Sequence, residues 1–272
     1  MAKQIIPATL REVMARPDFP RWALTAAAVV ALVGGLTAAG LLGGEPISRH
    51  GDLTETSSLL APAAPALRIW VVLGVLFALY VAWQWLPVAP DQARAQASCY
   101  PATGALFLAG LWFVMALAGG VFLCALLSVG LVVCLAWGLA RMRSLPSTFG
   151  VRHLTQAPFA VGLGWAMIVC LSSIGSLLAT WGSRAFWMSA DVWAMLAVIG
   201  LLGTGMALIR YLPGRLYTAL GLAWGLLWLG YARLLRSPRS IPVALVAGLA
   251  SGLIVISAVA VFLWVRTRAR HG

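Results

Sequence analysis

The side chains best suited to bind a ligand are aromatic and weakly polar groups that recur at helical spacing within apolar segments. Trp70, Phe77 and Gln84 are seven residues apart, and Tyr80 lies beside them on the same helix face. Gln84 is the only amide within the long apolar segments as we delimit them. Such a face could form the wall of a pocket for a flat apolar ligand, with the amide orienting it.

A second face of this kind lies on the segment 157–180. Pro158, Trp165 and Ser172 again recur every seven residues, and Ser173 is adjacent to them. The alternative for both faces is ordinary helix packing, in which the serine hydroxyls bond to the backbone.

Two further tryptophans, Trp112 and Trp137, lie deep within apolar segments, away from the ends where Trp anchors a helix to the membrane interface. We expect these rings to meet Trp70, Tyr80 and Trp165 around one cavity among the first five segments. The expected ligand is flat and hydrophobic because the walls are aromatic and carry few polar groups.

Groups that carry most enzyme chemistry are missing from the interior of these segments. All 26 charged side chains, 19 basic and 7 acidic, lie outside the segments or at their ends. Asp191, next to Ser189, suits the first turn of a helix, where a carboxylate is stabilised. The histidines and cysteines show no metal-ligand spacing. We therefore predict a protein that is not an enzyme and requires no metal or cofactor.

Eight apolar segments position these side chains, and each is long enough to cross about 30 Å of hydrocarbon as a helix. They cover residues 22–43, 67–87, 102–118, 121–140, 157–180, 188–209, 217–235 and 241–265. Gly119 and Gly120 divide one long apolar run, which predicts a tight helical hairpin. The chain is 62% hydrophobic and 10% charged, so we predict an all-α polytopic transmembrane bundle of about eight helices.

The net charge of +12 indicates membrane orientation rather than nucleic-acid binding, because the basic residues lie in short loops and tails. If both termini are cytoplasmic, the opposite side carries a minority of the 19 basic residues. These are Arg49, Arg68, Arg184, Arg233, Arg236 and Arg239. The last three share one loop, which departs from the positive-inside rule. We expect an integral protein of a bacterial plasma membrane, in contact with the lipid bilayer.

Glycines spaced by four residues predict close helix contacts. Gly221 and Gly225 form one such pair, and Gly248 and Gly252 form another. We favour packing within one chain, and a homodimer is the alternative.

Three stretches resemble a known family, the tryptophan-rich sensory proteins, which include TspO and the mitochondrial benzodiazepine receptor (translocator protein). The resemblance is to the longer bacterial form of this family. Residues 47–70, ISRHGDLTETSSLLAPAAPALRIW, are similar to the family's proline-containing loop and the aromatic start of its second helix. Residues 157–173, APFAVGLGWAMIVCLSS, are similar to its Pro-aromatic helix with a central Trp. Residues 192–244 look like the added C-terminal helices of the long form.

The resemblance implies a five-helix core at 22–180 and three added helices within 181–265. A cytoplasmic segment, 1–21, precedes the core, and a basic tail, 266–272, ends the chain. The resemblance also implies a tetrapyrrole ligand (porphyrin or haem) or a sterol, with a sensory or regulatory role. This chain departs from the family pattern at Gly74, where an aromatic residue is usual, and at the serines 172 and 173, where Asn is common.

Two other functions remain open from the sequence: a small-molecule transporter or exporter, and a structural or regulatory membrane subunit that binds no ligand. The scarcity of charge within the segments argues against ion-coupled transport. The deep tryptophans and the Gln84 face favour a pocket over an inert subunit. The candidate ligand-binding residues are Trp70, Phe77, Tyr80, Gln84, Trp112, Trp137, Pro158, Trp165, Ser172 and Ser173.

The charge distribution predicts that both termini are cytoplasmic. A reporter that functions only in the cytoplasm should be active when it is fused after Gly272, and a reporter that requires export should be inactive. Activity of a reporter that requires export would contradict an even number of crossings with a cytoplasmic N-terminus.

Overall fold

A computed structural model describes residues 18–43, 45–49, 53–86, 92–180, 182 and 188–271, with side chains described as far as residue 263. Within these ranges all regular structure is helical, and eight helical spans are long and apolar enough to cross a membrane. In chain order the elements are α2 (Phe19–Ala38), η1 (Ala64–Arg68), α3 (Ile69–Gln84), α4 (Gln92–Leu117), α5 (Val121–Arg141), α6 (Phe149–Thr180), α7 (Ala190–Tyr211), α8 (Arg215–Leu235) and α9 (Ile241–His271). The predicted all-α bundle of eight helices is confirmed.

Two helix boundaries differ from the predicted ones because helices continue past proline into polar sequence. The predicted third segment began at residue 102, after Pro101, but α4 begins at Gln92 and contains that proline. Arg94 therefore lies within α4 rather than in a loop. It is buried, and its guanidinium donates to the Leu145 carbonyl at 2.7 Å. The fifth segment likewise begins at Phe149 and encloses Pro158.

The predicted hairpin between α4 and α5 is confirmed. Gly119 has a φ of +75°, in the left-handed region that glycine adopts without a steric penalty. Val121 begins α5 directly after it, so the long apolar run crosses the membrane twice.

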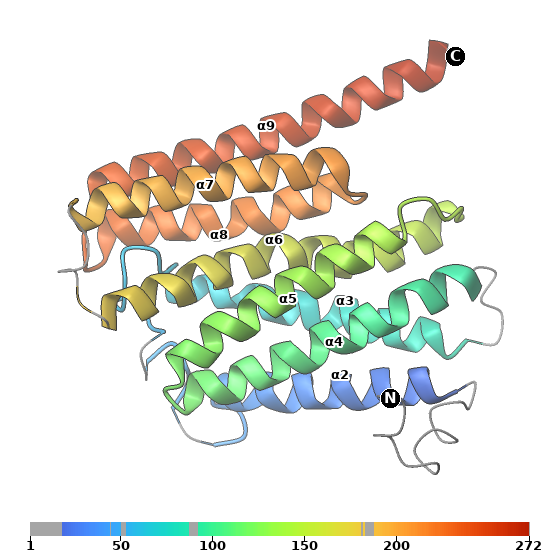
Figure 1. Ribbon diagram of the computed structural model, residues 1–272, viewed down its shortest axis with the longest axis horizontal. Coiled ribbons are helices and arrows are strands. Elements are labelled where there is room, and N and C mark those ends of the chain that lie inside the picture. Colours follow the sequence, from blue (N-terminus) through green and yellow to red (C-terminus); the bar gives the residue numbers. More distant parts are fainter. Residues whose placement is uncertain are drawn as a thin grey trace, which may run out of the picture.

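Helix α6 lies at the centre of the bundle and contacts α3 and α5 on one side and α8 on the other. Figure 1 shows α7, α8 and α9 grouped beyond α6, opposite α2. The chain also begins α2 and ends α9 at the same end of the bundle (Figure 1). The long connection between α2 and α3, the end of α6 and the end of α8 therefore meet at the opposite end.

Glycines form the seam between α6 and α8. A Cβ at Gly164 would lie 2.3 Å from the Thr218 carbonyl oxygen, and one at Gly221 would lie 2.3 Å from the Val161 carbonyl oxygen. Gly225 is in equally close contact with α6. The predicted packing role of the pair Gly221 and Gly225 within one chain is confirmed, because no larger residue fits at this backbone approach.

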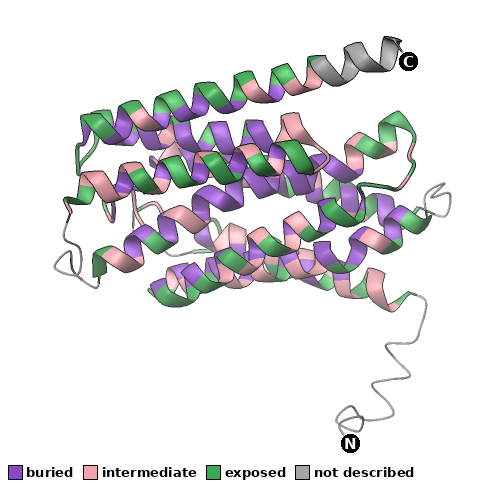
Figure 2. Ribbon diagram, turned by 45° about the horizontal axis from the view of Figure 1, so that its top comes forward, coloured by how far each residue is buried: buried purple, intermediate pink, exposed green. Residues whose placement is uncertain are grey.

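The second glycine pair faces outward. A Cβ at Gly248 or Gly252 would meet no atom of a neighbouring element within 4 Å, and both residues lie on the exposed side of α9. Figure 2 shows buried residues on the inner faces of the helices and exposed residues on the outer faces of the bundle. This outer apolar surface is the one that meets lipid in a membrane protein.

The seam predicts a sharp difference between two identical substitutions. Gly221→Val should destabilise the fold by about 1–3 kcal/mol or prevent folding, because the added side chain overlaps the α6 backbone. Gly248→Val adds the same atoms in open space and serves as the control. Thermal unfolding in detergent, followed by size-exclusion chromatography, measures both. Equal stability of the two variants would contradict the seam.

Candidate ligand-binding site

Aromatic rings from three helices meet near the end of the bundle that holds the long α2–α3 connection. Trp70 of α3 lies 6.1 Å from Trp112 of α4 and 6.1 Å from Trp165 of α6, measured between ring centroids. Phe113 lies 4.7 Å from Trp70 in an edge-on arrangement. These four rings form the aromatic cluster. Trp70 meets Phe113 and Trp165 edge-on, a favourable geometry for aromatic pairs, and lies tilted by 30° to Trp112.

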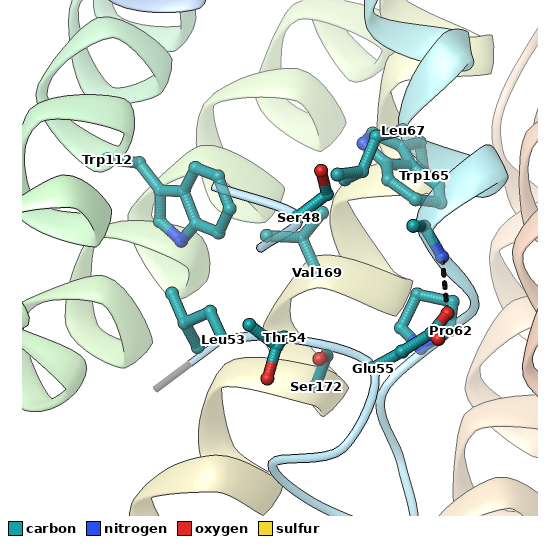
Figure 3. A pocket seen from close by; sticks show the side chains of 11 residues that line it. Ser48, Leu53, Thr54, Glu55, Pro62, Leu67, Trp112, Trp165, Val169 and Ser172 are labelled. Atoms are coloured by element: carbon teal, nitrogen blue, oxygen red, sulfur yellow. Dashed lines mark hydrogen bonds between the residues drawn. The ribbon is translucent and has the colours of Figure 1, made fainter. Parts of the chain in front are cut away.

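A cavity lies between this cluster and the chain that precedes η1. Trp112 and Trp165 stand on opposite sides of it, and Leu53, Thr54 and Glu55 lie along one edge (Figure 3). The complete lining is Ser48, Leu53, Thr54, Glu55, Pro62, Ala64, Leu67, Trp112, Trp165, Val169 and Ser172. We call residues 53–62 the roof, because they close the cavity from the end of the bundle.

The cavity is small in this structure. About 40 Å³ is open to the centres of water-sized molecules, which is room for only a few waters. A ligand larger than this enters only if part of the lining moves. The walls belong to long helices, whereas the roof contains neither helix nor strand. We therefore expect the roof to move, which would draw Leu60 and Ala61 out of buried positions.

Two indole nitrogens at the cluster are buried donors for which no described residue is an acceptor. They belong to Trp70 and Trp165, and the Trp165 side chain is only 1% exposed. The third indole, Trp112, donates to the Ser173 hydroxyl at 3.4 Å. A buried donor without a partner is costly, so the free N–H group of Trp165, which lines the cavity, would be stabilised by a ligand that carries a hydrogen-bond acceptor. Trp70 packs against the cavity walls but does not line the cavity.

The predicted face on α3 does not act as one surface. Trp70 belongs to the cluster, but Gln84 lies 14 residues further, about 21 Å along the helix. There Gln84 donates to the Tyr80 hydroxyl at 2.7 Å, and Tyr80 donates to Ser98 at 2.7 Å. Phe77 packs between these levels, 5.8 Å from Phe159. Tyr80 and Gln84 therefore tie α3 to α4 and do not line the aromatic cavity, contrary to the expectation from their spacing.

The predicted face on α6 divides in the same way. Trp165 and Ser172 line the cavity, and Ser173 holds Trp112. Pro158 is buried on α6, about 10 Å along the helix from Trp165, and does not line the cavity.

Trp137 does not belong to the site, and the expectation that it lines the cavity is wrong. Its side chain is 46% exposed on the outside of α5. Arg141, one turn further, lies over its ring at 5.6 Å. The distance of a residue from the ends of an apolar segment does not show whether its side chain faces lipid or the bundle. Trp137 and Trp112 could therefore not be distinguished by position alone.

The roof residues Leu53, Thr54 and Glu55 are the part of the site that the residue pattern missed. Glu55 accepts a hydrogen bond from the Ala64 amide at 3.0 Å, drawn dashed in Figure 3, and this bond caps the start of η1. Its carboxylate is one of only seven acidic groups in the chain. An acid just before an aromatic helix start was the available signal. Among the described residues, no three His, Cys, Asp or Glu side chains lie close enough to hold a metal.

One family model matches this chain. The family model described as TSPO-like protein matches residues 21–262, nearly the whole chain, and confirms the resemblance drawn from the loop and helix patterns. Comparisons with curated proteins and with solved structures gave no match.

The buried α3–α4 network predicts a variant that separates stability from binding. Gln84→Leu should destabilise the protein by about 1–2 kcal/mol, because the Tyr80 hydroxyl loses its donor. It should leave the affinity for any ligand of the aromatic cavity unchanged, because Gln84 lies about 21 Å along the helix from Trp70. Chemical or thermal unfolding measures the first effect. A large loss of ligand affinity at unchanged stability would contradict this prediction and indicate that Gln84 belongs to the binding site.

Proposed function

The chain belongs to the TSPO-like family and is an integral membrane protein with eight candidate membrane-spanning helices. From this premise we propose that it binds a flat hydrophobic ligand, such as a porphyrin, haem or a sterol, in the aromatic cavity and has a sensory or regulatory role without catalysis. The expected bound state is non-covalent.

The observation that supports this proposal is a cavity walled by Trp112 and Trp165, with the Trp70 ring packed against both of them outside the lining. Trp112 and Trp165 come from different helices, and their rings offer broad apolar surface to a planar molecule. The free indole N–H group of Trp165, which lines the cavity, favours ligands with an acceptor at the ring edge. A porphyrin carries carboxylates at its edge and a sterol carries a hydroxyl, so both classes offer an acceptor to this donor.

The size of the cavity supports a sensory role over constant occupancy. With about 40 Å³ open, a tetrapyrrole requires movement of the roof. Binding would therefore change the position of residues 53–62, and a change at the surface end of the bundle is what a signalling partner could detect.

Transport is less well supported. The buried cations Arg94 and Arg233 both donate to backbone carbonyl oxygens. A cation engaged in this way stabilises the fold, whereas ion-coupled transporters usually place an ionisable group on the substrate path.

The experiment is a titration of the purified protein with protoporphyrin IX, followed by quenching of Trp fluorescence. Trp165→Ala should weaken binding about 5- to 150-fold, the equivalent of about 1–3 kcal/mol for one lost aromatic wall. Trp137→Ala is the matched control, because that ring lies on the outside of α5. Trp165→Phe should restore much of the affinity by keeping an aromatic wall.

Equal weakening by Trp165→Ala and Trp137→Ala would indicate partitioning of the dye into protein and detergent. If neither a porphyrin nor a sterol showed saturable binding, the ligand-free structural subunit would replace this proposal.

A further inference from the structure

Arg233, near the end of α8, is a fully buried cation that binds the roof. Its side chain has no measurable exposure. The guanidinium donates to the carbonyl oxygen of Glu55 at 2.6 Å and to that of Ser58 at 3.0 Å, with a longer contact to Ala61 at 3.4 Å. It also donates to the Pro238 carbonyl at 2.9 Å. One side chain from the added helices thus spans most of the roof.

The chemistry of arginine suits this position. The roof contains neither helix nor strand between Leu53 and Ala63, so several of its carbonyl groups have no partner within regular structure. A guanidinium presents five N–H donors in a rigid plane and can satisfy several carbonyls together. Lysine has the same charge but only three donors at one point, so it cannot reproduce this set of contacts.

The far end of the roof is fixed to α8 by two more bonds. The Ala63 amide donates to the Trp228 carbonyl at 3.2 Å, and the Trp224 indole donates to the Ala66 carbonyl at 3.0 Å. These bonds hold the start of η1.

Other contacts hold the roof as well, because Leu60 and Ala61 are buried, and Leu60 belongs to the hydrophobic core. Glu55 lies 3.8 Å from the Arg236 guanidinium in a partly exposed ion pair, which contributes little in water. Ser57 and Ser176 of α6 share a hydrogen bond at 2.8 Å. Among the described polar contacts of the roof, Arg233 is the side chain that bonds three of its carbonyl groups.

We propose that Arg233 is a positioning residue that holds the roof closed over the aromatic cavity, so that ligands enter and leave only when its bonds to the roof carbonyls are released. This inference rests on the proposed function for the identity of the ligand, but the contact between Arg233 and the roof is independent of it. It also accounts for the basic loop that departs from the positive-inside rule: Arg233 and Arg236 serve the roof rather than membrane orientation.

The first test measures the roof without any ligand. Hydrogen exchange of the amides of Ser57, Ala61 and Ala64 should be about tenfold or more faster in Arg233→Lys than in the wild type, because loss of charged hydrogen bonds raises the opening equilibrium. Arg239→Lys is the matched control, since Arg239 is exposed in the same connection between α8 and α9. Unchanged exchange in a folded Arg233→Lys protein would overturn the inference.

The second test measures ligand kinetics with protoporphyrin IX by stopped flow. Arg233→Lys should raise the association and dissociation rates together, each about tenfold, with a smaller change in the equilibrium constant. A structural defect alone would lower affinity without faster association. Identical rates in the wild type and in Arg233→Lys would overturn the inference.

A third test closes the roof and leaves Arg233 in place. In the double variant Ser57→Cys, Ser176→Cys, the new thiols replace hydroxyl oxygens that lie 2.8 Å apart, close enough for a disulfide after small adjustment. Oxidation with copper phenanthroline should block porphyrin binding, and dithiothreitol should restore it. Wild type treated in the same way controls for the native cysteines. Unhindered binding to the oxidised variant, with the disulfide verified by mass spectrometry, would overturn the inference.

Failure of the proposed function can be distinguished from failure of this inference. Faster exchange in Arg233→Lys, with no porphyrin or sterol binding to the wild type, would support the contact between Arg233 and the roof and reject the ligand. Saturable wild-type binding, with exchange and rates unchanged in Arg233→Lys, would support the ligand and reject the role of Arg233.

Discussion

The position of Arg233 depends on a physical constraint, since a buried guanidinium is stable only when acceptors compensate its charge. Here backbone carbonyls of the roof and of the turn after α8 accept from its two Nη groups, whereas no described residue accepts from Nε. The requirement works in both directions, because an irregular segment at the end of a membrane bundle also needs donors for its carbonyls. One interaction therefore joins α8 to the roof of the cavity, whose other walls come from η1, α4 and α6.

Helix α6 carries the rest of this arrangement. One side presents Trp165 and Ser172 to the cavity, and another side meets α8 at the glycine seam of Gly164 and Gly221. The close backbone approach places α8 where Arg233 reaches the roof. The packing of small residues deep in the bundle thus determines the position of a polar contact at its end.

The bundle also separates two kinds of aromatic and polar chemistry along its length. The end near the roof contains the tryptophan cluster and its unpaired indole donors. The other end contains the network of Gln84, Tyr80 and Ser98. The described hydrogen bonds of this network are short, and they link α3 to α4. A satisfied network stabilises the fold, whereas unsatisfied donors at a cavity favour a ligand.

The sequence alone determined the membrane class, the number of spans, the hairpin at Gly119 and the family, because hydropathy, glycine placement and motif order are local properties of the chain. It also indicated that Trp70, Trp112, Trp165 and Ser172 belong near a site. Only the tertiary structure decided that Trp137 faces outward, that Tyr80 and Gln84 serve α4, and that the roof is held from α8. Helical periodicity shows which residues share a face but not what that face meets. The roof partners of Arg233 lie more than 170 residues earlier in the chain, so only the packing of α8 against α6 brings them together.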